Sequence, residues 1–309
     1  MGESAEMVYV SLEHLIRLQF RAAGFSFLPR QPVASLLSGR HASRLRGRGL
    51  DFDELRHYRP GDDIRSLDWK VTNRTGKPHV RCYREERERE VLLLVDQRLS
   101  MFFGSRIRMK SVVAAELAAL ACWRVVNAGD RCGALVFNDQ QIAEHKPRRN
   151  RSAVMQLLGK VAAYNRALRT GHDTYPAPEQ LNRVLGQAER LVSHDGLVVL
   201  ISDLNGWNQE TLQRLKRLSR HNDVITGLVF DRLERQLPKV GELVASDGRS
   251  QIQFDAKKDR LAQRYETDFE GSVDLLQAEL RTHAVPVIPL DTEGAVDQQL
   301  RRAIGDAAR

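Results

Sequence analysis

Two polar segments of the sequence each follow a short apolar run, and they hold the side chains best placed for binding chemistry. After the run 91–95 come Asp96, Arg98 and Ser100, and at the end of the run 197–202 come Asp203 and Asn205. In open α/β sheets, ligands bind beyond the carboxyl ends of the strands. A polar residue at a strand end is more often a turn or a helix cap, so the functional interpretation requires both segments to meet at one sheet edge.

A second set of charged residues lies upstream, between residues 46 and 70. Its acids alternate with arginines, so the charges can form bidentate Arg–carboxylate pairs within this block. We therefore expect a structural role first, with Tyr58 and Trp69 as its apolar anchors. The alternative is a metal-dependent hydrolase that uses Asp62, Asp63 and Asp68 as ligands, although their spacing matches no known metal pattern.

Sequence motifs of the common enzyme classes are absent. There is no GxxxxGK[ST] loop for a nucleoside triphosphate, no GxSxG elbow, no HExxH pair and no glycine-rich fingerprint after the first strand. The nine histidines are scattered, and only His172 lies near the presumed site. We therefore expect no enzymatic activity.

The elements that must position these residues alternate between strand and helix from residue 91 onward. Five apolar runs rich in Val, Ile and Leu (91–95, 133–137, 197–202, 224–230 and 285–290) are typical of strands buried on both faces. Helical patterns separate most of them, at 107–127, 151–168, 178–192, 209–220 and 257–282. This alternation predicts an α/β fold with a doubly wound, mostly parallel, six-stranded sheet, in which 91–95 is central and 285–290 lies at an edge. Residues 241–254 should form an inserted hairpin.

The first part of the chain does not show this alternation of strand and helix. A short amphipathic helix is expected near residues 11–23, followed by five arginines without an acid between residues 30 and 48. We therefore divide the chain into an N-terminal α+β extension, residues 1–87, and an α/β domain, residues 88–309.

The α/β domain resembles a von Willebrand factor A domain. That family holds Mg²⁺ in a metal-ion-dependent adhesion site, with a D-x-S-x-S loop after the first strand, a threonine on a second loop and an aspartate after the fourth strand. The resemblance assigns Asp96 to the first aspartate, Ser100 to the second serine and Asp203 to the last aspartate. Thr174 is the candidate threonine, and Thr170 is the alternative.

Arg98 departs from this pattern, because it stands where the family has the first serine of the loop. The change removes an oxygen ligand and brings a permanent cation to the place of a dication. The expectation is a degenerate adhesion site in which Arg98 pairs bidentately with Asp96 or Asp203. We expect no resident cofactor, with Mg²⁺ as the alternative.

The charged block closely resembles the signature of domain-of-unknown-function family 58. The resemblance covers residues 25–210 well and the remainder loosely. The signature positions are Asp51, Glu54, Tyr58, Pro60, Gly61, Asp62, Asp63, Arg65, Asp68 and Trp69. Proteins of this family join the block to an A-type domain, and they are commonly grouped with MoxR-type AAA+ ATPases.

The resemblance implies a non-catalytic, protein-binding adaptor. Its partners would be a MoxR-type AAA+ ATPase and other A-domain proteins, and its role would be chaperone-like assembly or maturation of other proteins. The contact is expected on the loops after the first and fourth strands, with Arg98 and Asp203 near its centre and Asn205 as a further partner-binding residue.

Composition limits the location and the other partners. The net charge of +8 is compatible with an acidic partner. The sequence has no motif that combines aromatic and basic residues, and this argues against nucleic acid as that partner. No apolar stretch approaches the roughly 18 residues that a membrane-spanning helix requires. Three widely spaced cysteines, Cys82, Cys122 and Cys132, are typical of reduced thiols. The sequence therefore predicts a cytoplasmic protein without a membrane span.

Overall fold

A computed structural model of the chain describes residues 8–22, 50–85, 88–169, 175–238, 241–246, 251–255 and 259–306. The chain divides into two compact units. The sheet unit comprises Met1–Ser26 and Arg89–Arg309, and the signature unit comprises Phe27–Glu88.

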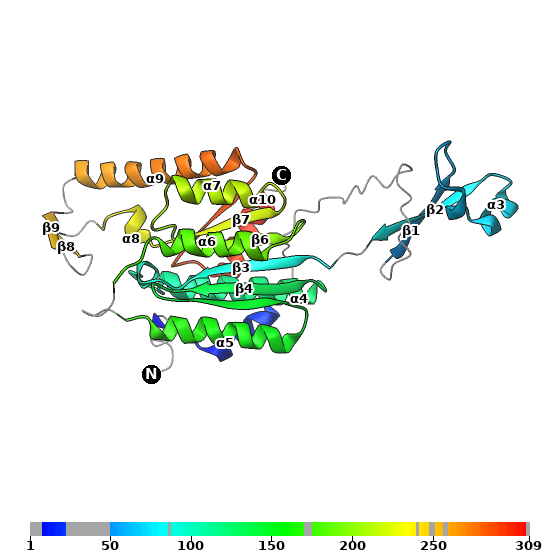
Figure 1. The fold of residues 1–309 in the computed structure, drawn as a ribbon. Coiled ribbons are helices and arrows are strands. Elements are labelled where there is room, and N and C mark those ends of the chain that lie inside the picture. Colours follow the sequence, from blue (N-terminus) through cyan, green and yellow to red (C-terminus); the bar gives the residue numbers. More distant parts are fainter. Residues whose placement is uncertain are drawn as a thin grey trace. The chain divides into compact units, whose positions relative to one another are not determined.

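The centre of the sheet unit is a six-stranded sheet with the strand order β10-β7-β6-β3-β4-β5 (Figure 1). Five strands are parallel, and β5 runs antiparallel to β4 at one edge. The strands are β3 (Glu90–Asp96), β4 (Arg131–Phe137), β5 (Ile142–Arg148), β6 (Leu197–Ser202), β7 (Asp223–Phe230) and β10 (Val287–Asp291). The predicted fold class is confirmed, with β3 in the middle of the sheet and β10 at an edge.

Burial explains which strands the sequence revealed. All six residues of β6 are buried, as are the last six of β3 and of β4, so each of these strands is a continuous apolar run. In β5, by contrast, partly buried and exposed residues mostly alternate, because one face of this edge strand meets water. Its sequence, with Glu144, His145 and Lys146 at its middle, carries no apolar run, and the strand was missed.

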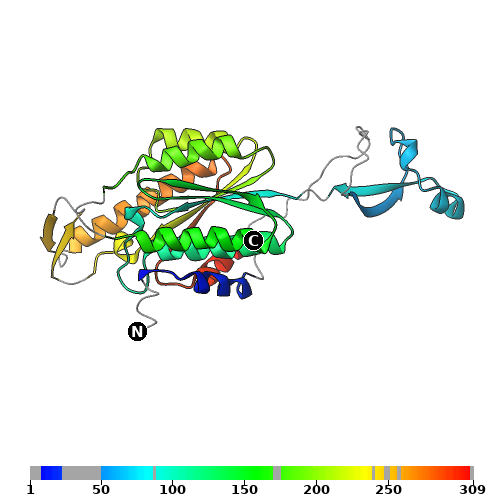
Figure 2. The same ribbon diagram turned by 60° about the horizontal axis from the view of Figure 1, so that its bottom comes forward.

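Helices cover both faces of the sheet, and Figure 2 shows the two layers. One layer contains α4 (Lys110–Asn127), α5 (Arg151–Ala167) and α10 (Val296–Asp306). The other contains α6 (Gln180–Leu191), α7 (Gln209–Leu218) and α9 (Asp259–Arg281), whose apolar side chains join those of β3, β6 and β7 in one core cluster. Fifteen of the eighteen residues of α4 are buried, which makes it the innermost helix.

The N-terminal helix belongs to the sheet unit, which corrects the predicted division at residue 87. Helix α2 (Leu12–Arg17) and the 3₁₀ turn η1 (Leu18–Phe20) pack on α4 and α5. The indole Nε1 of Trp123 donates to the carbonyl of Leu15 at 3.0 Å, and the amide of Val10 donates to Oδ1 of Asn165 at 2.7 Å. Buried hydrogen bonds of this kind fix the segment in place. Its apolar stripe signalled a helix but could not show which unit the helix would join.

The signature unit is built on an antiparallel hairpin of β1 (Leu50–His57) and β2 (His79–Glu85). Leu50 pairs with Glu85 at one end, and His57 pairs with His79 at the other. The connection between the strands, residues 58–78, holds the 3₁₀ turn η2 (Ile64–Ser66) and helix α3 (Trp69–Thr75).

Three shorter elements complete the described chain. The predicted hairpin near residues 241–254 is present as β8 (Glu242–Ser246) and β9 (Gln251–Asp255), which pair with each other alone. The 3₁₀ turn η3 (Leu99–Met101) follows β3, and the short helix α8 (Arg232–Arg235) follows β7.

Candidate functional site

The candidate site lies where β3 and β6 end side by side. These strands are parallel neighbours in the sheet, so Asp96 and Ser202, the last residues of each, reach the same edge. The side chains there are deeply buried, with Asp96 at 0% and Arg98 at 1% exposure. The sequence prediction that the two polar segments meet is therefore confirmed by the sheet order.

An internal ion pair occupies the centre of this edge. The guanidinium of Arg98 donates through Nε to both carboxylate oxygens of Asp96, at 3.0 and 3.1 Å, and through Nη2 to Oδ2 at 2.6 Å. The hydroxyl of Ser202 donates to the same Oδ2 at 2.6 Å. Burial alone would lower the pKa of Arg98, but the carboxylates of Asp96 and Asp203 outweigh it and hold the pKa above its ordinary value. Burial raises the pKa of Asp96 above its ordinary value, against the opposing effect of Arg98 and Ser202. Arg98 therefore stays a cation, and Asp96 accepts its hydrogen bonds through both carboxyl oxygens.

The other end of the guanidinium fixes two loops. Nη1 of Arg98 donates to the carbonyl of Asn205 at 2.9 Å and to that of Pro178 at 3.2 Å, so one side chain joins β3 to the loop after β6 and to the start of α6. The loops approach closely at Gly206, where φ is +87° and a Cβ would lie 2.4 Å from the Pro178 carbonyl oxygen. Only glycine fits that position.

A second cation completes the network. Nζ of Lys110, the first residue of α4, donates to Oδ2 of Asp203 at 3.0 Å and to Oε1 of Glu234 at 2.6 Å. Oδ1 of Asp203 lies 3.7 Å from Nη2 of Arg98. Burial would raise the pKa of Asp203, but Lys110 and Arg98 outweigh it and hold the pKa below its ordinary value. Asp203 is thus a carboxylate between two cations.

This geometry does not fit Mg²⁺ at the adhesion-site position. Both oxygens of Asp96 already accept hydrogen bonds from Arg98, and a dication there would lie against the guanidinium. The hydroxyl of Ser100 is buried and has no hydrogen-bond partner among the described residues. Thr174 and Thr170 lie outside the described residues, as does His172. Within the described part of the chain, no group of three His, Cys, Asp or Glu side chains could hold a metal ion.

The burial of the network corrects the predicted contact residues. Arg98 is 1% exposed and the side chain of Asp203 is 7% exposed, so neither can lie at the centre of a contact with another protein. Asn205 is exposed. The two charged residues instead lie beneath the surface and hold the loops in place through hydrogen bonds.

Sequence reasoning missed three members of the network. Lys110 and Glu234 are polar residues at helix starts, far from Asp203 in the sequence, and nothing in their spacing indicates that they meet. Ser202 was assigned to its strand but given no role. Asp139 was also missed, although it holds two loops through hydrogen bonds from the amides of Leu99, at 2.7 Å, and Ala177, at 2.8 Å.

In the signature unit, each of the three acids proposed as metal ligands has a separate structural task. Asp62 accepts two hydrogen bonds from the guanidinium of Arg56, at 2.7 and 2.8 Å. Asp68 pairs with Arg81 at 2.8 Å and caps α3 through the amides of residues 70 and 71. Asp63 caps η2. Both arginine partners belong to this unit, so the predicted Arg–carboxylate pairing operates inside it.

Other signature positions differ from the expectation. Trp69 was predicted to be an apolar anchor, but it is the first residue of α3 and lies on the outer face of that helix, where it is 60% exposed. Pro60 and Gly61 form the turn after β1, where Gly61 has φ of +105°. Arg65 is exposed and Tyr58 is partly buried. The side chains of Asp51 and Glu54 lie outside the described part of the structure.

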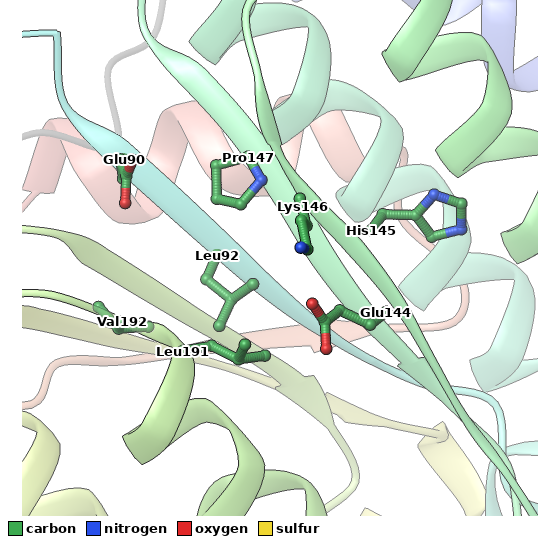
Figure 3. A pocket seen from close by; sticks show the side chains of 8 residues that line it. All are labelled: Glu90, Leu92, Glu144, His145, Lys146, Pro147, Leu191 and Val192. Carbon is green, nitrogen blue, oxygen red and sulfur yellow. The ribbon is translucent and has the colours of Figure 1, made fainter.

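A cavity of about 350 Å³ lies between β3, β5 and α6 (Figure 3). It begins at Glu90, the first residue of β3, and so lies at the opposite end of that strand from Asp96. Figure 3 shows Glu144 and Lys146 on one side of β5 and His145 turned to the other. Nε2 of Gln187 donates to Glu144 at 3.3 Å. The arrangement contains no nucleophile with a neighbouring base.

Comparison with known proteins identifies the family. The family model described as "Protein of unknown function DUF58" matches residues 54–273. The chain belongs to this family. Uncharacterized proteins of Mycobacterium tuberculosis and Mycobacterium bovis are 31% identical to it over 228 residues, which are 72% of this chain and 68% of theirs. These bacterial relatives add no activity, because none is described for them.

The similar solved structures are more distant from this chain in sequence. The conserved hypothetical protein BatB from Bacteroides thetaiotaomicron has a TM-score of 0.43 and 12% identity over 71% of this chain and 98% of its own. The VWA domain of SpRpn10 has a TM-score of 0.35 and 9% identity over 69% of this chain and 94% of its own. The sheet unit has the predicted α/β fold, with a doubly wound, mostly parallel, six-stranded sheet.

The predicted cytoplasmic location is contradicted. An aerotolerance-related membrane protein from Bacteroides fragilis is among the similar structures, with a TM-score of 0.42 and 13% identity over 71% of this chain and 99% of its own. Within the residues that the structure describes, no helix is long and apolar enough to cross a membrane.

Proposed function

We propose that the protein is a non-catalytic, protein-binding adaptor that works with a MoxR-type AAA+ ATPase in the assembly or maturation of other proteins. Membership of the DUF58 family and the A-type fold favour a role in protein interactions. The ATPase partner rests on the resemblance of the signature block and on the absence of a nucleotide-binding loop in this chain.

One observation carries the proposal. The loops at the carboxyl edge of the sheet are held rigid from below by the Arg98 and Lys110 networks, while apolar side chains stand exposed above them. Phe103 is 40% exposed and its ring lies 5.9 Å from Nζ of Lys110, and Tyr175 is 65% exposed next to the start of α6. Exposed aromatics on a preordered support are typical of protein contacts, because little conformational freedom is lost on binding.

The same network argues against catalysis at this edge. Asp96, Arg98, Asp203 and Lys110 satisfy each other, so no described carboxylate or amine among them is left to act as a base or a nucleophile. The hydrolase alternative has no observation in its favour, because Asp62, Asp63 and Asp68 accept hydrogen bonds from separate partners.

The proposal is tested by direct binding to a purified MoxR-type ATPase of the same organism, with ATP, with ADP and without nucleotide. We expect saturable binding that weakens at least tenfold in Phe103→Ala/Tyr175→Ala. Leu275→Ala on α9 is the control, because it removes an apolar side chain that is 74% exposed away from this edge. The chain alone should hydrolyse no ATP.

Two results would overturn the proposal. One is an absence of binding in every nucleotide state, which would remove the ATPase as a partner. The other is a loss of binding in Leu275→Ala equal to that in the double variant, which would place the contact elsewhere.

A further inference from the structure

One end of the signature unit gathers exposed cations around two exposed apolar side chains. All of them lie in residues 58–78, the single connection between β1 and β2. Because His57 pairs with His79, this connection begins and ends at one end of the hairpin. The chain enters and leaves the hairpin at the other end, where Leu50 pairs with Glu85. The connection therefore forms the tip of the unit that is farthest from its covalent links, as Figure 1 shows for α3.

The apolar part of this tip consists of Ile64, which is 62% exposed, and Trp69, which is 60% exposed. Five residues of chain can span at most about 18 Å, and the turn η2 shortens that distance. Side chains with more than half of their surface in water protrude and do not line a cleft. The indole of Trp69 also has no hydrogen-bond partner among the described residues, so its polar edge is available to an outside group.

The charged part of the tip consists of five exposed cations, which are Arg59, Arg65, Lys70, Arg74 and Lys77. None of them forms a side-chain ion pair with a residue that the structure describes. On α3, Lys70 and Arg74 lie one turn apart and adjoin Trp69 on the outer face, whereas Val71 and Thr72 face inward.

The acids of the tip do not neutralise these cations. Asp62 is paired with Arg56 of β1, and Asp68 is paired with Arg81 of β2. Asp62 also interacts electrostatically with Arg59, so among the acids of residues 58–78 Asp63 alone remains to offset the other four exposed cations. The whole signature unit, residues 27–88, has fourteen Lys and Arg against nine Asp and Glu, an excess of five in a chain whose net charge is +8. The positive charge of the protein is thus concentrated in this unit.

We propose that the tip of the signature unit, formed by η2 and α3, is a docking surface for an anionic phospholipid bilayer. Lysine and arginine side chains near such a surface each add about 1 kcal/mol of attraction. Tryptophan prefers the headgroup region, where its ring is apolar and its N–H is hydrated. Ile64 would enter the adjoining acyl boundary beside it. This surface is separate from the sheet edge, and the inference does not depend on the adaptor role.

The chemistry of the tip favours a bilayer over the other anionic partners. A nucleic acid would gain from several stacking rings, but the second apolar group is an isoleucine, which cannot stack on a base in this way. An acidic protein would need a surface shaped to receive two protruding side chains. A bilayer needs no such shape, because its headgroups rearrange around any protruding apolar group.

The first test measures co-sedimentation of the full chain with vesicles made of equal parts phosphatidylcholine and phosphatidylglycerol. We expect binding that is absent with pure phosphatidylcholine and weakened by added salt. Lys70→Glu/Arg74→Glu should reduce the partition coefficient about 25-fold or more, since each basic residue contributes a factor of about five. Lys216→Glu/Arg220→Glu makes the same change in net charge and should reduce binding far less, because these exposed residues lie in the last turn of α7 and just after it, in the sheet unit.

The second test places the tip in the membrane directly. Vesicles with brominated acyl chains should quench part of the tryptophan emission of the bound protein. Trp69→Phe should abolish this quenching, and Trp207→Phe, in the sheet unit, should retain it. Equal losses in the two charge-reversal variants would overturn the proposal, as would quenching that persists in Trp69→Phe. Binding of an oligonucleotide or an acidic peptide through Lys70 and Arg74, without binding to vesicles, would assign the tip to that partner instead.

Discussion

Replacing Arg98 with methionine should destabilise the sheet unit by about 3–5 kcal/mol, the usual cost of removing one partner from a buried ion pair. Methionine keeps most of the length and apolar contact of the side chain but removes the charge. Asp96 is 0% exposed and would keep only the hydroxyl of Ser202 and one backbone amide as donors. A buried carboxylate without a counter-ion then lies in the middle of the sheet edge.

The hydrogen bonds give a similar magnitude. Arg98 reaches Asp96 through two groups, Nε and Nη2, and a hydrogen bond to a charged group contributes about 1.5–3 kcal/mol. The two together give about 3–6 kcal/mol. Loss of the bonds to the Asn205 and Pro178 carbonyls adds a further cost, which water entering the loops would partly offset.

The assay is urea unfolding followed by tryptophan fluorescence in a Trp69→Phe background. Trp123 and Trp207 then report on the sheet unit alone. Arg217→Met is the matched control, because Arg217 is 51% exposed and pairs with Glu189 at 3.2 Å on the surface. It should cost less than about 1 kcal/mol.

A double variant separates loss of the pair from loss of packing. Asp96→Asn/Arg98→Met leaves no unpaired charge and should be more stable than Arg98→Met alone. The reasoning fails if Arg98→Met costs less than about 1 kcal/mol, or if the double variant is no more stable than the single one.

Three further predictions concern the same edge. Lys110 and Arg98 lower the pKa of Asp203 in the folded protein. The stabilisation that Asp203 contributes is therefore complete above the pKa of an unfolded aspartate, about 3.9, and is lost as the pH falls below it. The urea midpoint of the wild type should decline below about pH 4, and that of Asp203→Asn should decline less. Calorimetry should detect no micromolar binding of Mg²⁺ or Mn²⁺, whereas Arg98→Ser, checked for folding by circular dichroism, should gain binding; micromolar binding by the wild type that is lost in Asp203→Ala would contradict this. Gly206→Ala should destabilise the protein by about 1–3 kcal/mol, because Gly206 has a positive φ and lies close to another loop. Gly159→Ala should stabilise it by about 0.5–1 kcal/mol, because Gly159 lies within a helix with open space around it. Equal unfolding midpoints for the two variants would show that Gly206 is not under this constraint.

The sequence could predict the sheet because its central strands are buried on both faces. Burial on both faces requires the continuous apolar runs of β3, β4, β6 and β7, and parallel strands require the helices that alternate with them. Asp96 and Asp203 could be placed together for the same reason, since the carboxyl ends of neighbouring parallel strands share one edge.

The parts that the sequence could not predict depend on contacts between distant residues. Lys110 reaches Asp203 across 93 residues, and no local pattern encodes that approach. The pairing of Arg98 with Asp96 was predicted and is present. Its full burial was not predicted, because the carbonyl groups that surround Arg98 belong to Pro178 and Asn205, which are distant in the sequence. Trp69 was predicted to be an apolar anchor because large aromatic residues are highly buried on average, but its side chain is exposed.

The hydrogen bonds of the N-terminal helix to the sheet unit have a topological consequence. Because residues before and after the signature unit belong to the same body, that unit is an insertion held at both ends. A single proteolytic cut in either connection would leave it attached through the other, and its effective concentration beside the sheet unit would persist. Insertions of this kind can be removed as a whole cassette when the flanking residues are rejoined. The signature unit can therefore be deleted as a whole, and the N-terminal helix α2 would stay packed on the sheet unit.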